Sequence, residues 1–171
     1  MKEIHENILT EKERRSLLKF VKTKLEVNTD RHPGIQTYNK LHEFEELNIF
    51  LKKIKKYYAP YKIFTCWAVC TMSNSLLWHN HVGKYDSGVA NYGSKDQKYK
   101  TNPSKWSFVY YLQNKHGVGT MFKDPSITAY DLIEYSNGKQ NSLLKFSSSI
   151  IHSSPISHKQ FERYIISLDV K

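Results

Sequence analysis

The part of the chain that most constrains its fold begins at Tyr61, where short runs rich in β-branched and aromatic residues alternate with turn-forming residues. Such runs are typical of β-strands, because branched and aromatic side chains pack well on a pleated surface. The expected strands are Tyr61–Met72, Leu76–Val82, Trp106–Gln113, Gly117–Lys123, Tyr130–Tyr135, Asn141–Ser147, Ile150–Ser153 and Phe161–Val170.

Two connections between these strands carry signals of their own. Asn137-Gly138 is typical of a two-residue hairpin turn, because both residues accept the positive φ that such a turn needs. The polar stretch from Gly83 to Lys105 is longer than most loops of compact domains, and loops of this length are usually functional or mobile. Its five lysines outnumber its two aspartates, so it has a net positive charge.

The first sixty residues are expected to be helical. Thr10-Glu11-Lys12-Glu13 has the capping-box pattern that begins a helix. After a break at His32-Pro33-Gly34, a second helix is expected over Lys40 to Tyr58, where apolar residues recur at helical spacing. Lysines at the end of this helix oppose the negative end of its dipole, which favours a solvated helix face over an anion-binding patch.

These regions together predict an α+β fold that is mainly β. We expect a double-stranded β-helix, a jelly-roll or cupin-like barrel, flanked by N-terminal helices. A single domain over residues 1–171 would then have a helical flank at 1–60 and a jelly-roll core at 61–171. The chain has 39% hydrophobic and 13% aromatic residues, enough for one core, which excludes a disordered or collagen-like chain.

The net charge of +10 favours anionic partners, a class that includes nucleic acid, acidic protein and small anions. No apolar run is long enough to span a bilayer, and the polar N-terminus lacks the pattern of a signal peptide, so no membrane partner is expected. Cys66 and Cys70 would lie about 13 Å apart on one strand, too far for a disulfide. They are expected to be reduced core residues, which favours a cytoplasmic location. Abundant Lys, Asn, Ile, Tyr and Ser are consistent with an AT-rich, viral genome.

The densest cluster of metal-binding side chains is Trp78-His79-Asn80-His81. On a strand, His79 and His81 would project to the same face with Cα atoms about 6–7 Å apart, so two imidazoles could bind one ion. His152 is the best candidate for a third ligand, and three ligands with open positions are typical of non-haem iron sites. Histidines two apart also arise by chance, and a single histidine after a strand is often only hydrogen-bonded, so the pattern alone leaves the metal site open.

Arg163 lies within an expected strand of otherwise apolar and aromatic residues. A buried guanidinium needs a carboxylate partner, and Ser167 would lie on the same strand face. A guanidinium fork and a hydroxyl would make a good receptor for one end of a dicarboxylate. The alternative is an outward Arg163 paired with Glu162 or with an acidic residue of the N-terminal helices.

The order of these features resembles the Fe(II)- and 2-oxoglutarate-dependent dioxygenases, in particular their prolyl-hydroxylase-like branch. The shared order is an H-x-H motif, a tyrosine-rich strand, a distal histidine and then an arginine. The resemblance covers roughly residues 61–170. It implies that three histidines bind Fe(II), and that Arg163 binds the far carboxylate of 2-oxoglutarate. The implied metal ligands are His79, His81 and His152.

The resemblance also assigns further contacts to 2-oxoglutarate. The strand Ser107–Gln113 resembles the family's strand that ends in Tyr-Leu-Asn, and its first tyrosine, Tyr110, would offer a hydroxyl to the cosubstrate. The alternative for Tyr110 is a core aromatic with a satisfied hydroxyl. Ser167 would be a second hydroxyl at the cosubstrate.

Two departures from the family pattern stand out. His81 occupies the carboxylate position of the usual H-x-D motif; a three-His iron site is chemically sound, and Asp86 is an alternative source of a carboxylate. The family often has Arg-x-Ser, whereas here Ile165 follows at that spacing and the serine is Ser167.

The activity implied is hydroxylation of an unidentified substrate, with 2-oxoglutarate and dioxygen consumed and succinate and CO2 formed. A peptidyl, in particular prolyl, side chain is the first expectation, and a small molecule is the other. One alternative is a nucleic-acid demethylase of the same superfamily, which the +10 charge and the basic loop would suit. The others are a three-His cupin-like protein that does not use 2-oxoglutarate and a non-catalytic jelly-roll binding protein.

Overall fold

The computed structural model describes residues 1–27, 34–37, 40–71, 78–82, 104–123, 133–155 and 162–171. The described chain is mainly β, as the sequence predicts, and its strands form two antiparallel sheets. The larger sheet has the strand order β1-β8-β5-β10-β4-β3-β2, and the smaller one has the order β7-β6-β9. The strands are β1 (Lys2–Glu6), β2 (Glu26–Val27), β3 (Gly34–Gln36), β4 (Ile63–Thr71), β5 (Trp106–Gln113), β6 (Val118–Lys123), β7 (Ile133–Asn137), β8 (Ser142–Ser147), β9 (Ile151–Ser153) and β10 (Arg163–Val170).

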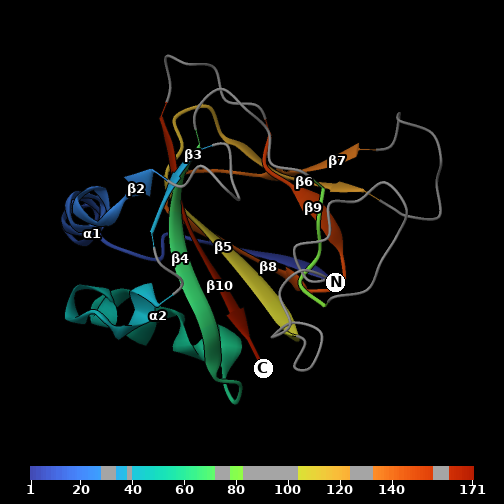
Figure 1. Ribbon diagram of the computed structural model, residues 1–171, viewed down its shortest axis with the longest axis horizontal. Helices are drawn as coiled ribbons and strands as arrows, with labels where there is room; N and C mark the ends of the chain where they lie inside the picture. The colour runs from blue at the N-terminus through green and yellow to red at the C-terminus, as the bar shows by residue number, and fades with distance from the viewer. Residues whose placement is uncertain (28–33, 38–39, 72–77, 83–103, 124–132, 156–161) are drawn as a thin grey trace.

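The larger sheet lies between the helices and the smaller sheet (Figure 1). Its two faces contribute to two separate apolar clusters, one on the helix side and one on the side of the smaller sheet. In the second cluster, Phe122 of β6 packs edge-on against Phe146 of β8, with ring centroids 5.2 Å apart. Two antiparallel sheets that pack in this way are consistent with a jelly roll.

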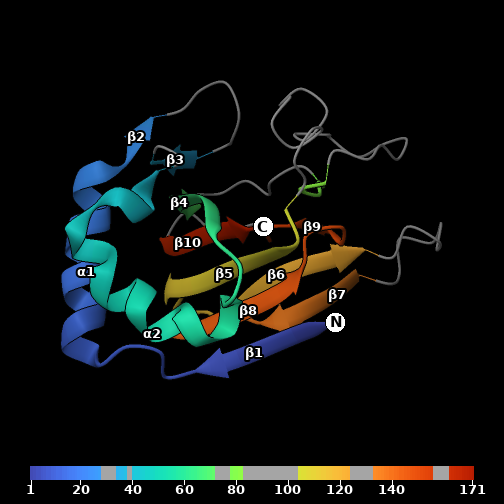
Figure 2. The ribbon, with the colours of Figure 1, turned by 90° about the horizontal axis from the view of Figure 1, so that it is seen from below.

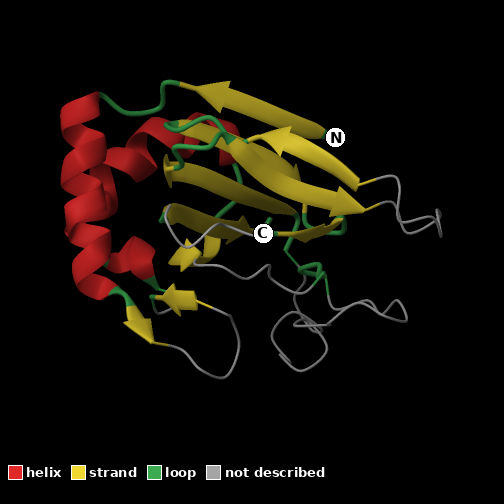
Figure 3. Ribbon diagram, turned by 90° about the horizontal axis from the view of Figure 1, so that it is seen from above, coloured by secondary structure: helices red, strands yellow, loops and turns green. Residues whose placement is uncertain are grey.

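The helices lie together on one side of the strands (Figure 3). Helix α1 (Glu11–Lys24) begins with the expected capping box: the Thr10 hydroxyl accepts from the Glu13 amide, and the Glu13 carboxylate accepts from the Thr10 amide. Helix α2 (Asn48–Tyr58) follows two short 3-10 helices, η1 (Leu41–Glu43) and η2 (Glu45–Leu47). The buried apolar side chains of the two helices are Leu17, Val21, Phe50 and Ile54, and all belong to the helix-side cluster.

The first sixty residues are not all helical. Strand β1 forms an edge of the larger sheet beside β8 (Figure 2), and β2 and β3 form the other edge. The exposed residues of β1 are mostly charged, so this edge strand lacks the apolar run by which the other strands are found in the sequence. The second helix begins later than expected, because residues 41–47 form 3-10 turns.

Two further expectations about strands are wrong. Of the expected strand Leu76–Val82, the structure describes residues 78–82, and these form an isolated bridge between His79 and His152 rather than a strand. Asn137-Gly138 does not form a hairpin, because β7 and β8 belong to different sheets. Gly138 instead lies against β6, where an added Cβ would be 2.5 Å from the backbone of Val118, so a close approach explains the glycine.

Strand β10 is the central strand that positions the site. It pairs with β4 on one side and β5 on the other, and all its residues are buried. Because side chains alternate along a strand, β10 serves both clusters. One face joins the helix-side cluster through Tyr164, Ile166, Leu168 and Val170, and the opposite face carries Arg163, Ile165, Ser167 and Asp169.

Cys66 and Cys70 are both free and buried, as the sequence predicts. Burial raises the pKa of the Cys66 thiol, which keeps it protonated. None of the described helices combines the length and the apolar character that crossing a bilayer requires.

Candidate active site

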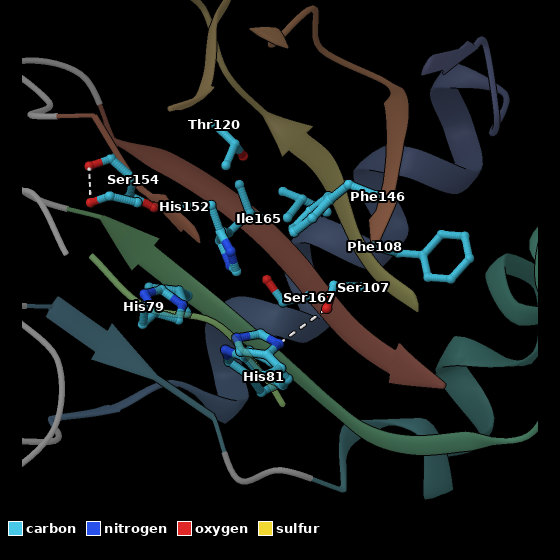
Figure 4. Close-up of a pocket in the computed structure, with 14 residues that line it drawn as sticks. His79, His81, Ser107, Phe108, Thr120, Phe146, His152, Ser154, Ile165 and Ser167 are labelled. Atoms are coloured by element: carbon cyan, nitrogen blue, oxygen red, sulfur yellow. Dashed lines mark hydrogen bonds between the residues drawn. The ribbon is translucent and has the colours of Figure 1, made fainter. Parts of the chain in front are cut away.

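Three buried histidines converge on one side of the larger sheet (Figure 4). They are His79, His81 and His152, and their nearest candidate ligand atoms all lie within 4.8 Å of one another. The ring centroids of His79 and His152 are 4.3 Å apart, and those of His81 and His152 are 5.0 Å apart. Metal–nitrogen bonds to histidine are about 2.0–2.1 Å long, so three nitrogens this close together could bind one metal ion.

Backbone hydrogen bonds hold these histidines in place. His79 and His152 exchange two N–H···O bonds, with N···O distances of 3.0 and 2.9 Å. The amide of His81 donates to the carbonyl oxygen of Ser148, 2.9 Å away. The segment 78–82 is held at both histidines by these bonds, and its two imidazoles lie on the same side with ring centroids 5.1 Å apart, as the sequence predicts.

Hydrogen bonds at Nδ1 orient two of the rings. His152 donates from Nδ1 to the carbonyl oxygen of Ile150 at 2.9 Å, and Nδ1 of His81 lies 2.7 Å from a carboxylate oxygen of Asp169. Burial, with smaller contributions from His79 and His81, lowers the pKa of His152 well below its ordinary value. His152 is thus neutral at physiological pH, which is the form that binds metals.

Arg163 is a buried cation that lacks a carboxylate among the described residues. Its side chain is on the pocket side of β10, and Nη1 donates to the hydroxyl of Ser154 at 3.3 Å. Nε and Nη2 are buried and have no hydrogen-bond partner among the described residues. Burial lowers the pKa of this guanidinium from its ordinary value. Two guanidinium nitrogens that have no hydrogen-bond acceptor among the described residues are suited to binding an anion.

The alternative in which Arg163 pairs with Glu162 is wrong. The Glu162 carboxylate accepts from the hydroxyl of Tyr164 at 2.8 Å and lies 3.5 Å from Nζ of Lys22. Both partners are on the helix side of the sheet, whereas Arg163 points to the other side. The guanidinium instead lies over the ring of Tyr111, 5.3 Å from its centroid.

A pocket is lined by the three histidines and by residues of β10. Arg163 does not line this pocket but donates to Ser154, which does, while Ser167 lines it directly. The wall is mixed, because imidazoles and hydroxyls line the pocket together with apolar side chains. Apolar lining residues include Trp67, Val69, Val109, Phe146 and Ile165.

The expected contact of Tyr110 with a cosubstrate is wrong. Tyr110 packs against Phe50 of α2 in the helix-side cluster, and its hydroxyl donates to Oδ1 of Asn141 at 2.7 Å. The next residue, Tyr111, is the tyrosine that faces the pocket side. Its hydroxyl lies 3.0 Å from Thr120 Oγ1 and accepts from the Thr120 amide at 2.9 Å.

Asp169 is the functional candidate that sequence reasoning missed. It is fully buried and contacts His81 directly. The signal was available, because Asp169 follows Ser167 by two residues and so lies on the same strand face as Arg163 and Ser167. Asp86, the alternative carboxylate ligand, and the lysine-rich stretch 83–103 lie outside the described residues.

No protein-family model matches the sequence, and no curated protein is similar to it. Solved structures do match over 99% of the chain. A viral collagen prolyl hydroxylase of Paramecium bursaria Chlorella virus-1, in complex with 2-oxoglutarate, has a TM-score of 0.67 and 13% identity, with 94% of that chain covered. A Trichoplax adhaerens prolyl hydroxylase, in complex with a hypoxia-inducible-factor peptide, has a TM-score of 0.66 and 12% identity, with 82% covered.

A third match is the non-haem 2-oxoglutarate-dependent epimerase SnoN of nogalamycin biosynthesis, with a TM-score of 0.71, 7% identity and 77% of that chain covered. These three proteins differ in what they act on but share one architecture. Sequence identities this low carry the fold and not the substrate. The chain therefore has the fold of the prolyl hydroxylases and other 2-oxoglutarate- and iron-dependent oxygenases.

Proposed function

We propose that this chain is an oxygenase that uses Fe(II), 2-oxoglutarate and dioxygen to hydroxylate its substrate. The observation that carries this proposal is Arg163, a buried guanidinium with two nitrogens that no described residue satisfies, beside a pocket with three histidines. Burying a charge without a partner is costly, so such a group is explained by an anion that binds in function.

The donor set fits Fe(II). Imidazole nitrogens suit iron, and the three rings are buried, close together and held by the backbone. In this proposal, His79, His81 and His152 hold the metal. When bound, iron and 2-oxoglutarate supply the oxidising chemistry, in which 2-oxoglutarate is converted to succinate and CO2 while dioxygen is consumed.

The protein's own residues position the cosubstrate and exclude water. Arg163 would hold the far carboxylate through Nε and Nη2, the two donors that are unsatisfied among the described residues. Ser167, on the same face of β10, would offer its hydroxyl to the cosubstrate inside the pocket. Apolar side chains such as Ile165 and Phe146 would keep water from the reacting groups.

For the substrate we propose a peptidyl side chain, with proline as the first case to test. Two of the matching structures are prolyl hydroxylases, and one of them is a complex with a peptide. The epimerase among the matches makes a small molecule the second class to test. The free, buried cysteines support a reducing, cytoplasmic location.

The decisive experiment is calorimetric titration of 2-oxoglutarate into the protein with Mn(II) in place of Fe(II). We expect binding only when metal is present, and about a 100-fold loss of affinity in Arg163→Met, because each charge-assisted hydrogen bond contributes about 1.5–3 kcal/mol. Mn(II) affinity should stay the same in this variant. Arg15→Met, which removes an exposed arginine of α1, is the matched control and should bind 2-oxoglutarate normally.

Two results would overturn the proposal: no 2-oxoglutarate binding by the metal-loaded protein, or unchanged binding in Arg163→Met. Turnover is then tested with Fe(II), 2-oxoglutarate and proline-rich peptides. The expected product is a peptide heavier by one oxygen atom, with one succinate formed for each peptide modified.

A further inference from the structure

Asp169 contacts the histidine cluster and has no exposed surface. In the sheet it lies between Ser107 of β5 and Thr65 of β4. The hydroxyl of Ser107 donates to Oδ1 at 2.7 Å, and the hydroxyl of Thr65 lies 3.4 Å from Oδ2. These two hydroxyls come from the strands on either side of β10, so the carboxylate is held from both sides.

The same carboxylate reaches one of the histidines. Oδ1 of Asp169 lies 2.7 Å from Nδ1 of His81. An ionised carboxylate can only accept, so the proton of this hydrogen bond is on Nδ1 of His81. A neutral imidazole that carries its proton on Nδ1 has its lone pair on Nε2, so Nε2 is the nitrogen that binds a metal in this tautomer.

We infer that Asp169 is a positioning residue that fixes His81 in the Nδ1–H tautomer and orients its Nε2 toward the metal site. This inference rests on the proposed function, because it assigns Asp169 a role at the proposed metal. Carboxylate–histidine–metal arrangements of this type raise the basicity of the ligand and fix the ring. Asp169 also keeps one negative charge next to the site although His81 occupies the position where the family has a carboxylate ligand.

A purely structural role for Asp169 makes a different prediction. If the carboxylate only accepted from Ser107 and Thr65, its replacement would lower stability but leave the His81 tautomer and the metal affinity unchanged. Asp169→Asn separates the two roles, because it keeps the size of the side chain and an oxygen acceptor for the hydroxyls. It removes the charge, and its amide can donate to Nδ1, which favours the opposite tautomer of His81.

The first test reads the tautomer directly, without metal or turnover. Imidazole nitrogen chemical shifts of the 15N-labelled protein are recorded by NMR in alkaline buffer. We expect His81 in the Nδ1–H form in the wild type and a shift toward the Nε2–H form in Asp169→Asn. An Nε2–H tautomer of His81 in the wild type would overturn the inference, and this result does not require any variant to fold.

The second test measures Mn(II) affinity by calorimetry. We expect Asp169→Asn to weaken binding roughly 10- to 100-fold, as is usual when an outer carboxylate is lost. Tyr110→Phe, which removes a buried hydroxyl on the opposite face of the same sheet, is the control and should leave the affinity unchanged. Equal affinity in Asp169→Asn and wild type would refute the role of Asp169. Absence of metal binding in the wild type would instead refute the proposed function, while the tautomer would still report on the Asp169–His81 contact.

Discussion

His79 and His152 exchange both hydrogen bonds of an antiparallel bridge, although they come from distant parts of the chain. Their rings are 4.3 Å apart because their backbones are paired. The closest pair of the histidine cluster is therefore set by main-chain geometry and not by the rotamers of long side chains. A site held in this way is largely preformed before any ion binds.

The first prediction concerns the number of ligands. His152→Ala should abolish tight Mn(II) or Co(II) binding, with a loss of affinity of at least roughly 100-fold, because two imidazoles alone hold such an ion weakly. His116→Ala, which removes an exposed histidine from the turn between β5 and β6, is the matched control. Calorimetry measures both variants. Unchanged metal binding in His152→Ala would show that His152 is not a ligand of the metal.

The second prediction separates stability from function at Arg163. Arg163→Met keeps most of the side-chain length and removes a buried charge that has no carboxylate partner among the described residues. The free energy of unfolding should therefore stay the same or rise by about 1 kcal/mol, while 2-oxoglutarate binding is weakened about 100-fold. Urea denaturation of the ligand-free protein measures the first effect. A loss of stability of several kcal/mol would mean that the guanidinium already has strong partners in the folded chain.

The third prediction compares the adjacent tyrosines. Tyr110→Phe should cost about 1 kcal/mol of stability, through the lost hydrogen bond to Asn141, and leave 2-oxoglutarate affinity unchanged. Tyr111→Phe should weaken 2-oxoglutarate binding, since it removes the hydroxyl that holds Thr120, a residue of the pocket wall. Denaturation and calorimetry on both variants check this. The reverse pattern would show that the faces of β5 have been assigned incorrectly.

The fourth prediction concerns acid stability at the start of α1. Glu13 caps the helix and pairs with Lys53 of α2, and the hydrogen bond from Lys53 is the main reason that its pKa falls from 4.5 to about 2. A carboxyl whose pKa is lower in the folded state stabilises the fold above its unfolded pKa and loses this contribution as it is protonated. Wild type should therefore melt at a higher temperature than Glu13→Gln at neutral pH, and the difference should shrink as the pH falls from about 4.5 to about 2. A difference in melting temperature that does not depend on pH would contradict this assignment.

The strands were predictable where the sequence is strongly apolar. Strand β5 has the bounds that composition alone indicates, and β10 differs from the expected strand by two residues at its start. The histidine pair was predictable because a period of two needs no knowledge of the rest of the fold. Strand β1 was not, because a short, charged edge strand has little apolar signal.

The faces of β5 could not be predicted for a different reason. Both faces of β5 are buried, one against the helices and one toward the smaller sheet, so this strand does not alternate between apolar and polar residues. Tyr110 and Tyr111 are chemically the same, and only the tertiary structure shows which of them faces the pocket. The prediction of a hairpin at Asn137-Gly138 was wrong for a similar reason. Local turn preference cannot show that two strands next to each other in sequence belong to different sheets.

The central place of β10 has a consequence for how the protein acquires its site. Its neighbours in the sheet, β4 and β5, both come much earlier in the chain, so its pairing requires the closure of long loops, which is the slow part of folding a β protein. Arg163, Ser167 and Asp169 all arrive with this strand. A partly folded chain that has not yet inserted β10 therefore lacks Arg163 beside the pocket and Asp169 beside His81, so the proposed site is incomplete in it. Gain of the site should coincide with the last cooperative step of folding.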